Sequence, residues 1–144
     1  MVPKIVIVHC AATPDFGPQD PKFDEFGEHE INQWHIERGF LGVGYHWVIR
    51  RTGVIEKGRP EDHLGAHCKG HNEGSIGICY VGTKVITDQQ VKSLNDLYRG
   101  IKERHGITLK DWYPHNYFNP NKICPGFDLN QLRSLIAENE VYPP

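Results

Sequence analysis

The amino-acid sequence predicts an α/β fold in which helices flank one mixed central β-sheet, and three observations support this prediction. The chain has 144 residues, 38% of them hydrophobic and 24% charged, which suits a single folded domain with a buried core. Strand-like runs alternate with amphipathic helical segments, a pattern typical of parallel strands covered by helices. Two further runs are joined by a short turn, which adds an antiparallel hairpin. We expect residues 1–144 to form one domain.

The first half of the chain contains a strand, a loop, a helix and the hairpin, in this order. KIVIVHC, residues 4–10, is a β-branched run typical of a buried strand, and the proline-rich residues 11–21 predict a loop. Residues 28–40 carry apolar side chains at roughly helical spacing and contain a glycine near their end, so they predict a short amphipathic helix. GYHWVIRR at 44–51 and GVIEKG at 53–58 are the strands of the predicted hairpin.

The second half of the chain contains another strand and two helices. SIGICYVG, residues 75–82, is an apolar run that predicts a buried strand. Residues 87–106 open with Thr and Gln at capping-box spacing, carry apolar residues on one face and end at a glycine, so they predict a long helix. A last helix is expected from about Leu129 to Glu138, with Asp128 as its N-cap.

Composition and charge argue against several classes of function. The formal net charge is -2 with neutral histidines, so no overall positive field attracts nucleic acid or acidic lipid. No apolar run approaches the length of an export signal or of a membrane span, about 18 residues, so we expect a cytoplasmic location in the producing cell. The four cysteines are then expected to be reduced thiols. Nothing in the sequence indicates more than a monomer.

One segment, HNYFNPNKICPGF at residues 115–127, places a histidine, a lysine and a cysteine close together. Its Asn and Pro content predicts an irregular loop. His115 and Cys124 could be no more than a surface histidine and a buried thiol. Alternatively, they are two zinc ligands, because zinc binds neutral imidazole and thiolate and such a loop can bend both toward one ion. A third protein ligand would be needed, and His9, at the end of a predicted buried strand, is the candidate.

Four segments of the sequence together resemble the zinc-dependent N-acetylmuramoyl-L-alanine amidases, the family of the amidase-type phage lysozymes and the peptidoglycan recognition proteins. They are IVIVHCAAT, INQWHIERGFLGVGYHWVIRRTGVIEKGR, GAHCKGHNEGSIGICYVG and NKICPGFDL, in family order. They cover nearly the whole domain, and the phage lysozymes look most similar. The resemblance implies a zinc amidohydrolase that cleaves between N-acetylmuramic acid and the L-alanine of the stem peptide in bacterial peptidoglycan. A phage or prophage endolysin that reaches the cell wall after release is the implied biological role.

The resemblance also implies which residues hold the metal. His9, His115 and Cys124 would be the zinc ligands in a surface cleft, with water in the fourth position, as a catalytic zinc site requires. The family more often has eight positions from this histidine to the cysteine, and here there are nine. We expect the irregular loop to absorb the extra residue.

Three more residues match functional positions of the family. Tyr45, in GYH, matches the catalytic tyrosine, and Lys122 matches the lysine that assists it in the phage lysozymes. A catalytic zinc lowers the pKa of its bound water toward about 7 and polarises a carbonyl, while Lys122 and Tyr45 would stabilise the negative oxygen that develops. The sequence does not divide proton transfer between these two residues. His67, in GAH, would lie at the wall of the substrate groove.

Two other interpretations stay open. A module of the same fold could bind muropeptides without cutting them, but that class typically loses the cysteine ligand, whereas this chain keeps both Cys124 and Tyr45. Zinc could also be structural, with a fourth side chain that closes the site. His63, His67 and His71 are spaced by four, but glycines interrupt the segment, which argues against a second metal site on a helix.

Overall fold

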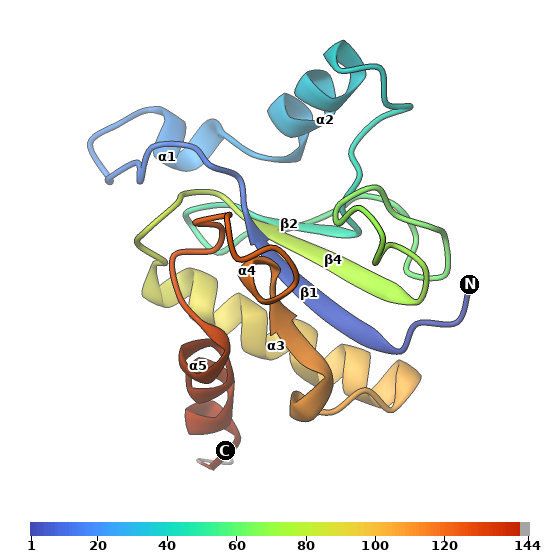
Figure 1. Ribbon diagram of the computed structural model, residues 1–144. Helices are drawn as coiled ribbons and strands as arrows, with labels where there is room; N and C mark the ends of the chain where they lie inside the picture. Colours follow the sequence, from blue (N-terminus) through green and yellow to red (C-terminus); the bar gives the residue numbers. More distant parts are fainter. Residues whose placement is uncertain (142–144) are drawn as a thin grey trace.

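A computed structural model describes the backbone of residues 1–141 and the side-chain surroundings of residues 1–136. It shows one α/β domain built on a five-stranded sheet with the strand order β3-β2-β4-β1-β5 (Figure 1). The strands are β1 (Ile5–Cys10), β2 (Trp47–Ile49), β3 (Ile55–Lys57), β4 (Ser75–Tyr80) and β5 (Trp112–Pro114). Only the β2–β3 pair is antiparallel, because it is the predicted hairpin, and the other neighbours run parallel. The predicted mixed sheet is therefore confirmed.

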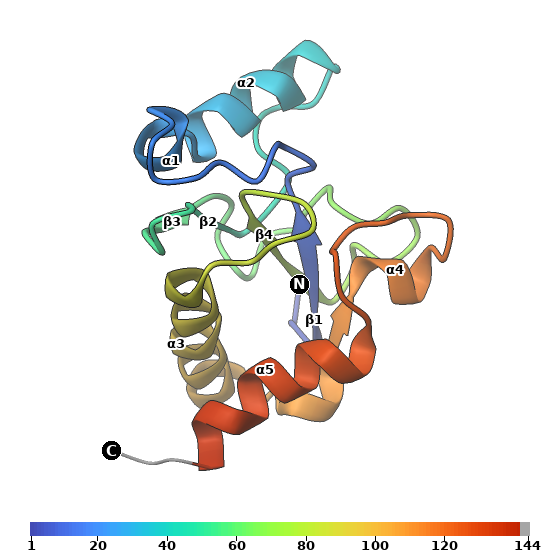
Figure 2. The ribbon, with the colours of Figure 1, turned by 90° about the vertical axis from the view of Figure 1, so that its left-hand side faces the viewer.

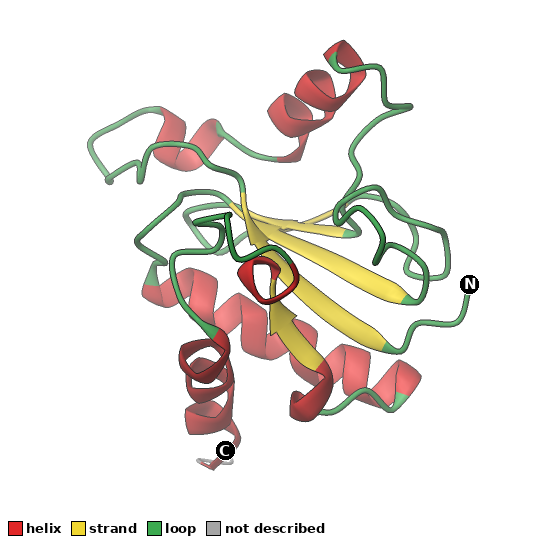
Figure 3. Cartoon of the chain, in the orientation of Figure 1, coloured by secondary structure: helices red, strands yellow, loops and turns green. Residues whose placement is uncertain are grey.

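Helices lie on both faces of this sheet, as Figures 2 and 3 show. The helices are α1 (Lys22–Glu25), α2 (Glu28–Glu37), α3 (Asp88–His105), α4 (His115–Phe118) and α5 (Leu129–Val141), with a short 3-10 helix, η1, at Leu109–Asp111. The α3 and α5 helices pack against one face, and α1 and α2 lie over the other. None of the helices in the described residues is long and apolar enough to cross a lipid bilayer.

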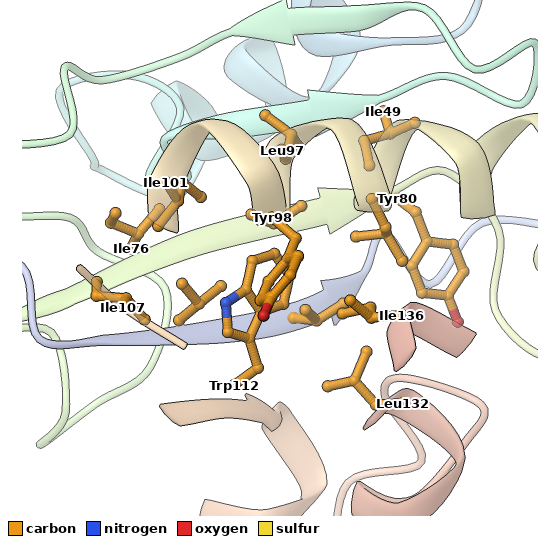
Figure 4. Close-up of a cluster of buried hydrophobic side chains, with 14 of the residues drawn as sticks. Ile49, Ile76, Tyr80, Leu97, Tyr98, Ile101, Ile107, Trp112, Leu132 and Ile136 are labelled. Carbon is orange, nitrogen blue, oxygen red and sulfur yellow. The ribbon is translucent and has the colours of Figure 1, made fainter. Parts of the chain in front are cut away.

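The main hydrophobic core fills the space between the sheet and helices α3 and α5. Figure 4 shows apolar side chains of all three elements meeting there, with Trp112 fully buried among them. Side chains alternate along a strand, so Val6, Val8 and Cys10 of β1 point into this core. His9 consequently points to the opposite face, which faces α2. Core packing on one side of β1 thus fixes the direction of a polar side chain on the other.

The predicted helix boundaries are confirmed where a capping signal exists. Thr87 Oγ1 accepts a hydrogen bond from the Gln90 amide, and Gln90 Oε1 accepts one from the Thr87 amide, each at 3.0 Å. The α3 helix stops at Gly106, whose φ of 69° lies in the left-handed region that glycine tolerates. Asp128 caps α5 by accepting from the Gln131 amide at 2.8 Å. Side-chain capping therefore made these ends readable from sequence.

Other predictions need correction. The hairpin strands are shorter than expected, so Tyr45 and His46 precede β2 instead of belonging to it. The edge strand β5 was not predicted, because a three-residue run that ends in proline shows no alternation. The prediction of an irregular loop at 115–127 is wrong for its first four residues, which form α4. A single helical turn is too short to produce a periodic pattern, and Asn119, Pro120 and Asn121 follow it directly.

A polar cluster links the loop after β3 to the end of α3. Glu61 accepts hydrogen bonds from Trp47 Nε1, from two Arg104 nitrogens, each at 2.8 Å, and from His105 Nε2 at 2.9 Å. Burial raises the pKa of the Glu61 carboxyl, but the bonds from Arg104, Trp47 and His105 outweigh it and lower the pKa to about 2. The ionised carboxylate therefore stabilises the fold at neutral pH.

Glu61→Gln is expected to lower the free energy of unfolding by about 1–2 kcal/mol at neutral pH, because charged hydrogen bonds are lost. Glu61 has a folded pKa below its unfolded value, so its contribution is complete above pH 4.5 and falls away as pH drops toward 2. Urea unfolding of both proteins across this range measures the difference. The exposed Glu37→Gln is the control, with an expected change within about 0.5 kcal/mol. A loss in the free energy of unfolding for Glu61→Gln that stays the same at all these pH values would contradict this account.

Candidate metal centre

Three side chains from distant parts of the sequence meet at one end of the sheet. The possible ligand atoms of His9, His115 and Cys124 all lie within 4.8 Å of one another. Parallel pairing of β1 with β5 places Pro114 beside Val8, so His115 follows directly next to His9, with ring centroids 4.3 Å apart. The structure thus brings together the three residues that the sequence suggested as ligands.

The segment between α4 and α5 returns Cys124 to the end of β1. Its Sγ accepts a hydrogen bond from the Cys10 amide at 2.7 Å and lies 3.2 Å from the Cys10 carbonyl oxygen. The nine-position spacing from His115 therefore does not keep the thiol from the two imidazoles. Cys10 itself packs into the main core and is absent from the group of possible ligands, as the alternation along β1 predicts.

The chemistry of these groups fits a zinc ion. His115 Nδ1 is buried without a hydrogen-bond partner, an uncommon state for a polar atom unless something else binds it. Burial, then the neighbouring His67 and His115, lower the pKa of His9, and burial followed by Lys122 lowers that of His115. Both rings are thus neutral near pH 7, the form that binds zinc. In the described part of the chain no fourth ligating side chain joins the group, so a zinc ion held by these three residues would keep one coordination position for another ligand.

A pocket of about 620 Å³ opens over this centre. Tyr45 lines it, with its ring centroid 5.2 Å from that of His9. Burial, then the Cys79 and Cys124 thiols, raise the pKa of Tyr45, so the phenol keeps its proton and can donate a hydrogen bond. Lys122 lies exposed at the same pocket and has no ion-pair partner among the described residues. Both residues therefore line the pocket that opens over the candidate centre.

His67 also lines the pocket, as expected, but it makes a contact that the sequence did not predict. Its Nδ1 lies 2.9 Å from His9 Nε2, and its Nε2 lies 3.1 Å from Ser75 Oγ. Asn72 holds the loop in place, because its Oδ1 accepts from the amides of His67 and Cys68 at 2.9 and 2.8 Å. Burial, then His46, lower the pKa of His67 to about 3, so this ring is neutral as well.

Two cationic residues of the pocket were missed from sequence. Arg38, just after α2, and Lys69 line it together with Lys122, and the lining contains no carboxylate. None of these three forms an ion pair in the part of the chain that the structure describes. Most basic residues in any sequence are solvated, so nothing local distinguishes these two. Only the folded arrangement identifies them.

The other histidines do not build a second centre among the described residues. His46 is fully buried, and its Nδ1 accepts from the Gly77 amide at 2.9 Å. His63 is exposed, and His71 stacks on Phe118 with ring centroids 4.3 Å apart. Residues 63–71 form no helix, as the interrupting glycines predict.

Comparison with known proteins gives consistent matches. The family model described as N-acetylmuramoyl-L-alanine amidase matches residues 1–127. Endolysins of Enterobacteria phage K11 and Escherichia phage T7 are each 38% identical, covering 86% and 88% of this chain and 81% and 82% of their own lengths. The solved amidase LysC from Clostridium intestinale has a TM-score of 0.76 at 30% identity, covering 97% of this chain and 87% of that one. Drosophila PGRP-LB has a TM-score of 0.75 at 25% identity, covering 99% and 83%.

Proposed function

The chain belongs to the N-acetylmuramoyl-L-alanine amidase family. We propose that it hydrolyses the amide between N-acetylmuramic acid and the L-alanine of the stem peptide, at a zinc ion held by His9, His115 and Cys124. It is a phage endolysin-like amidase, and peptidoglycan is the substrate or ligand of its family. The observation that carries the proposal is the convergence of the three ligand atoms within 4.8 Å beneath an accessible pocket. Two imidazoles, one thiolate and an open position are typical of a catalytic zinc site.

The proposed roles of the other residues follow from their places around this centre. A zinc ion bound there would polarise the scissile carbonyl and activate water for attack. Lys122 would hold a positive charge beside the carbonyl oxygen as that oxygen becomes negative. Tyr45 would donate a hydrogen bond from its phenol to the same oxygen or to the attacking water. His67 would contribute to the wall of the pocket.

The two alternative functions receive less support. A binding module without catalysis does not need a thiol ligand and a phenol at one pocket, and this chain has both Cys124 and Tyr45 there. A structural zinc site would need a fourth protein ligand, and the described residues supply three. We also infer that residues 1–144 form one amidase domain, although residues 142–144 lie outside the described part. We also propose that the enzyme is a monomer.

The charge of the pocket supports an anionic substrate. Arg38, Lys69 and Lys122 line it without any carboxylate, although the whole chain carries a net charge of -2. Unpaired cations at a concave site attract and orient anionic groups. The stem peptide of peptidoglycan carries free carboxylates, so we infer that these cations bind the peptide side of the substrate.

Digestion of purified bacterial cell walls is expected to release free stem peptides and to leave the glycan strands uncut, because only the bond between sugar and peptide breaks. Mass spectrometry of the soluble fragments measures both products. A metal chelator should abolish peptide release, and added zinc should restore it. Cleavage of the glycan strands, or release of peptides after complete removal of the metal, would contradict the proposal.

Cys124→Ser is expected to lose both bound zinc and amidase activity, because a serine hydroxyl is a poor replacement for a thiolate ligand. Cys68→Ser is the matched control, since Cys68 also lines the pocket but is not among the possible ligands. It should keep both properties. Metal content by atomic emission and activity on cell walls measure the effect, and equal losses in the two variants would indicate a general folding role for the thiols.

Arg38→Gln is expected to raise KM for wall fragments with free carboxylates by about fivefold and to leave kcat unchanged. The fivefold change corresponds to the loss of one exposed ion pair of about 1 kcal/mol. Fragments with amidated carboxylates should show no such change. Lys92→Gln, on the exposed surface of α3 away from the pocket, is the control. An unchanged KM for the carboxylate-bearing fragments would argue against this role of Arg38.

A further inference from the structure

A buried chain of hydrogen bonds connects strand β4 to the candidate zinc ligand on β1. It runs from the carbonyl oxygen of His71 to Ser75 Oγ at 2.6 Å, from Ser75 Oγ to His67 Nε2 at 3.1 Å, and from His67 Nδ1 to His9 Nε2 at 2.9 Å. Ser75 is fully buried and His9 nearly so. Neither the amidase reaction nor the pocket, as described above, makes use of Ser75.

The direction of each bond in this chain follows from the number of protons available. A serine hydroxyl has one proton, and a carbonyl oxygen can only accept. At 2.6 Å from the His71 oxygen, Ser75 must donate to it, because two acceptors this close would repel each other. Ser75 Oγ can then only accept from His67, so His67 carries its proton on Nε2.

The same reasoning assigns the proton on His9. A neutral His67 with a proton on Nε2 has a bare Nδ1, which accepts a hydrogen bond from His9 Nε2. His9 therefore carries its proton on Nε2, and its Nδ1 is the nitrogen with a free lone pair. His115 also has its Nδ1 buried without a partner. The lone pair of His9 Nδ1 and the unpartnered Nδ1 of His115 thus lie at the candidate metal centre.

The strand register explains why His67 fits between these two residues. His9 and Ser75 lie on the same face of neighbouring parallel strands, and Gly77 of β4 separates Ser75 from Cys79, the partner of His9. A Cβ added to Gly77 would lie 2.5 Å from the His67 ring, so the ring occupies the space that a side chain would take. The bare backbone of β4 is therefore required for the hydrogen-bonded chain to form.

We propose that Ser75 and His67 are positioning residues that hold His9 in the tautomer with a proton on Nε2 and thereby present its Nδ1 to the metal. This inference rests on the proposed zinc site. Metal-bound histidines commonly donate their second ring N–H to a neighbouring acceptor, which fixes ring orientation, and loss of that partner typically costs 10- to 100-fold in metal affinity. In this chain the acceptor is a second histidine, whose own proton is fixed by a buried serine.

Ser75→Ala tests the proposal through zinc affinity. Without the hydroxyl, the Nε2 proton of His67 loses its acceptor, so His67 can take the other tautomer, with its proton on Nδ1. In that tautomer Nδ1 no longer presents a lone pair to His9 Nε2. We expect zinc binding to weaken by about 10- to 100-fold, measured by competition with a chromophoric chelator. Ser93→Ala is the matched control, because Ser93 is also a buried serine whose hydroxyl donates to a backbone carbonyl oxygen, that of Gly53, on the far side of the sheet. It should leave zinc affinity unchanged.

A second measurement needs no substitution. Nitrogen NMR of the histidine rings in the zinc-loaded protein is expected to show His9 and His67 both neutral with the proton on Nε2. A proton on Nδ1 of His67 would overturn the proposal even if Ser75→Ala failed to fold. So would equal zinc affinities of the wild type and Ser75→Ala. Wild-type protein that binds no zinc would instead refute the metal site itself, and with it the positioning role of Ser75 and His67.

Discussion

The parallel pairing of β1 with its two neighbours is the constraint on which the site depends. The β5 strand places Pro114 beside Val8, and the chain then turns at once into α4, so His115 lies next to His9. The β4 strand, on the other side of β1, supplies Ser75 and the bare backbone of Gly77. A shift of either pairing by one residue would turn side chains to the wrong face and separate these groups.

The two faces of the sheet divide stability from chemistry. The face covered by α3 and α5 buries the large apolar side chains, and this packing holds β1 and β4 rigidly. The opposite face carries His9, which lies near the carboxyl end of β1. Ligand sites of α/β sheets commonly form at the carboxyl ends of parallel strands. Because side chains alternate, the core packing of Val8 and Cys10 turns His9, which lies between them, toward the opposite face.

The pocket combines buried neutral groups with exposed cations. Near the candidate metal centre, His9, His67 and Ser75 are held by hydrogen bonds, and burial lowers the pKa of both imidazoles, which keeps them neutral. At the rim, Arg38, Lys69 and Lys122 remain exposed and lack acidic partners. Two neutral imidazoles and a thiolate suit a metal cation at the bottom of the pocket, whereas the cationic rim suits an anionic substrate. The same cleft can therefore bind a metal cation at its bottom and an anionic substrate at its rim.

The sequence by itself determined the mixed sheet and the capped helix α3, and it singled out His9, His115 and Cys124, which the structure brings together. Periodicity, capping residues and segment resemblance are local signals. The sequence did not reveal β5 or α4, which are too short to show a period. Only the tertiary structure decided that His67 contacts His9, that Ser75 orients His67, and that Arg38 and Lys69 share the pocket. These contacts join residues far apart in the chain, and their geometry depends on strand register and on side-chain packing, which no local pattern encodes.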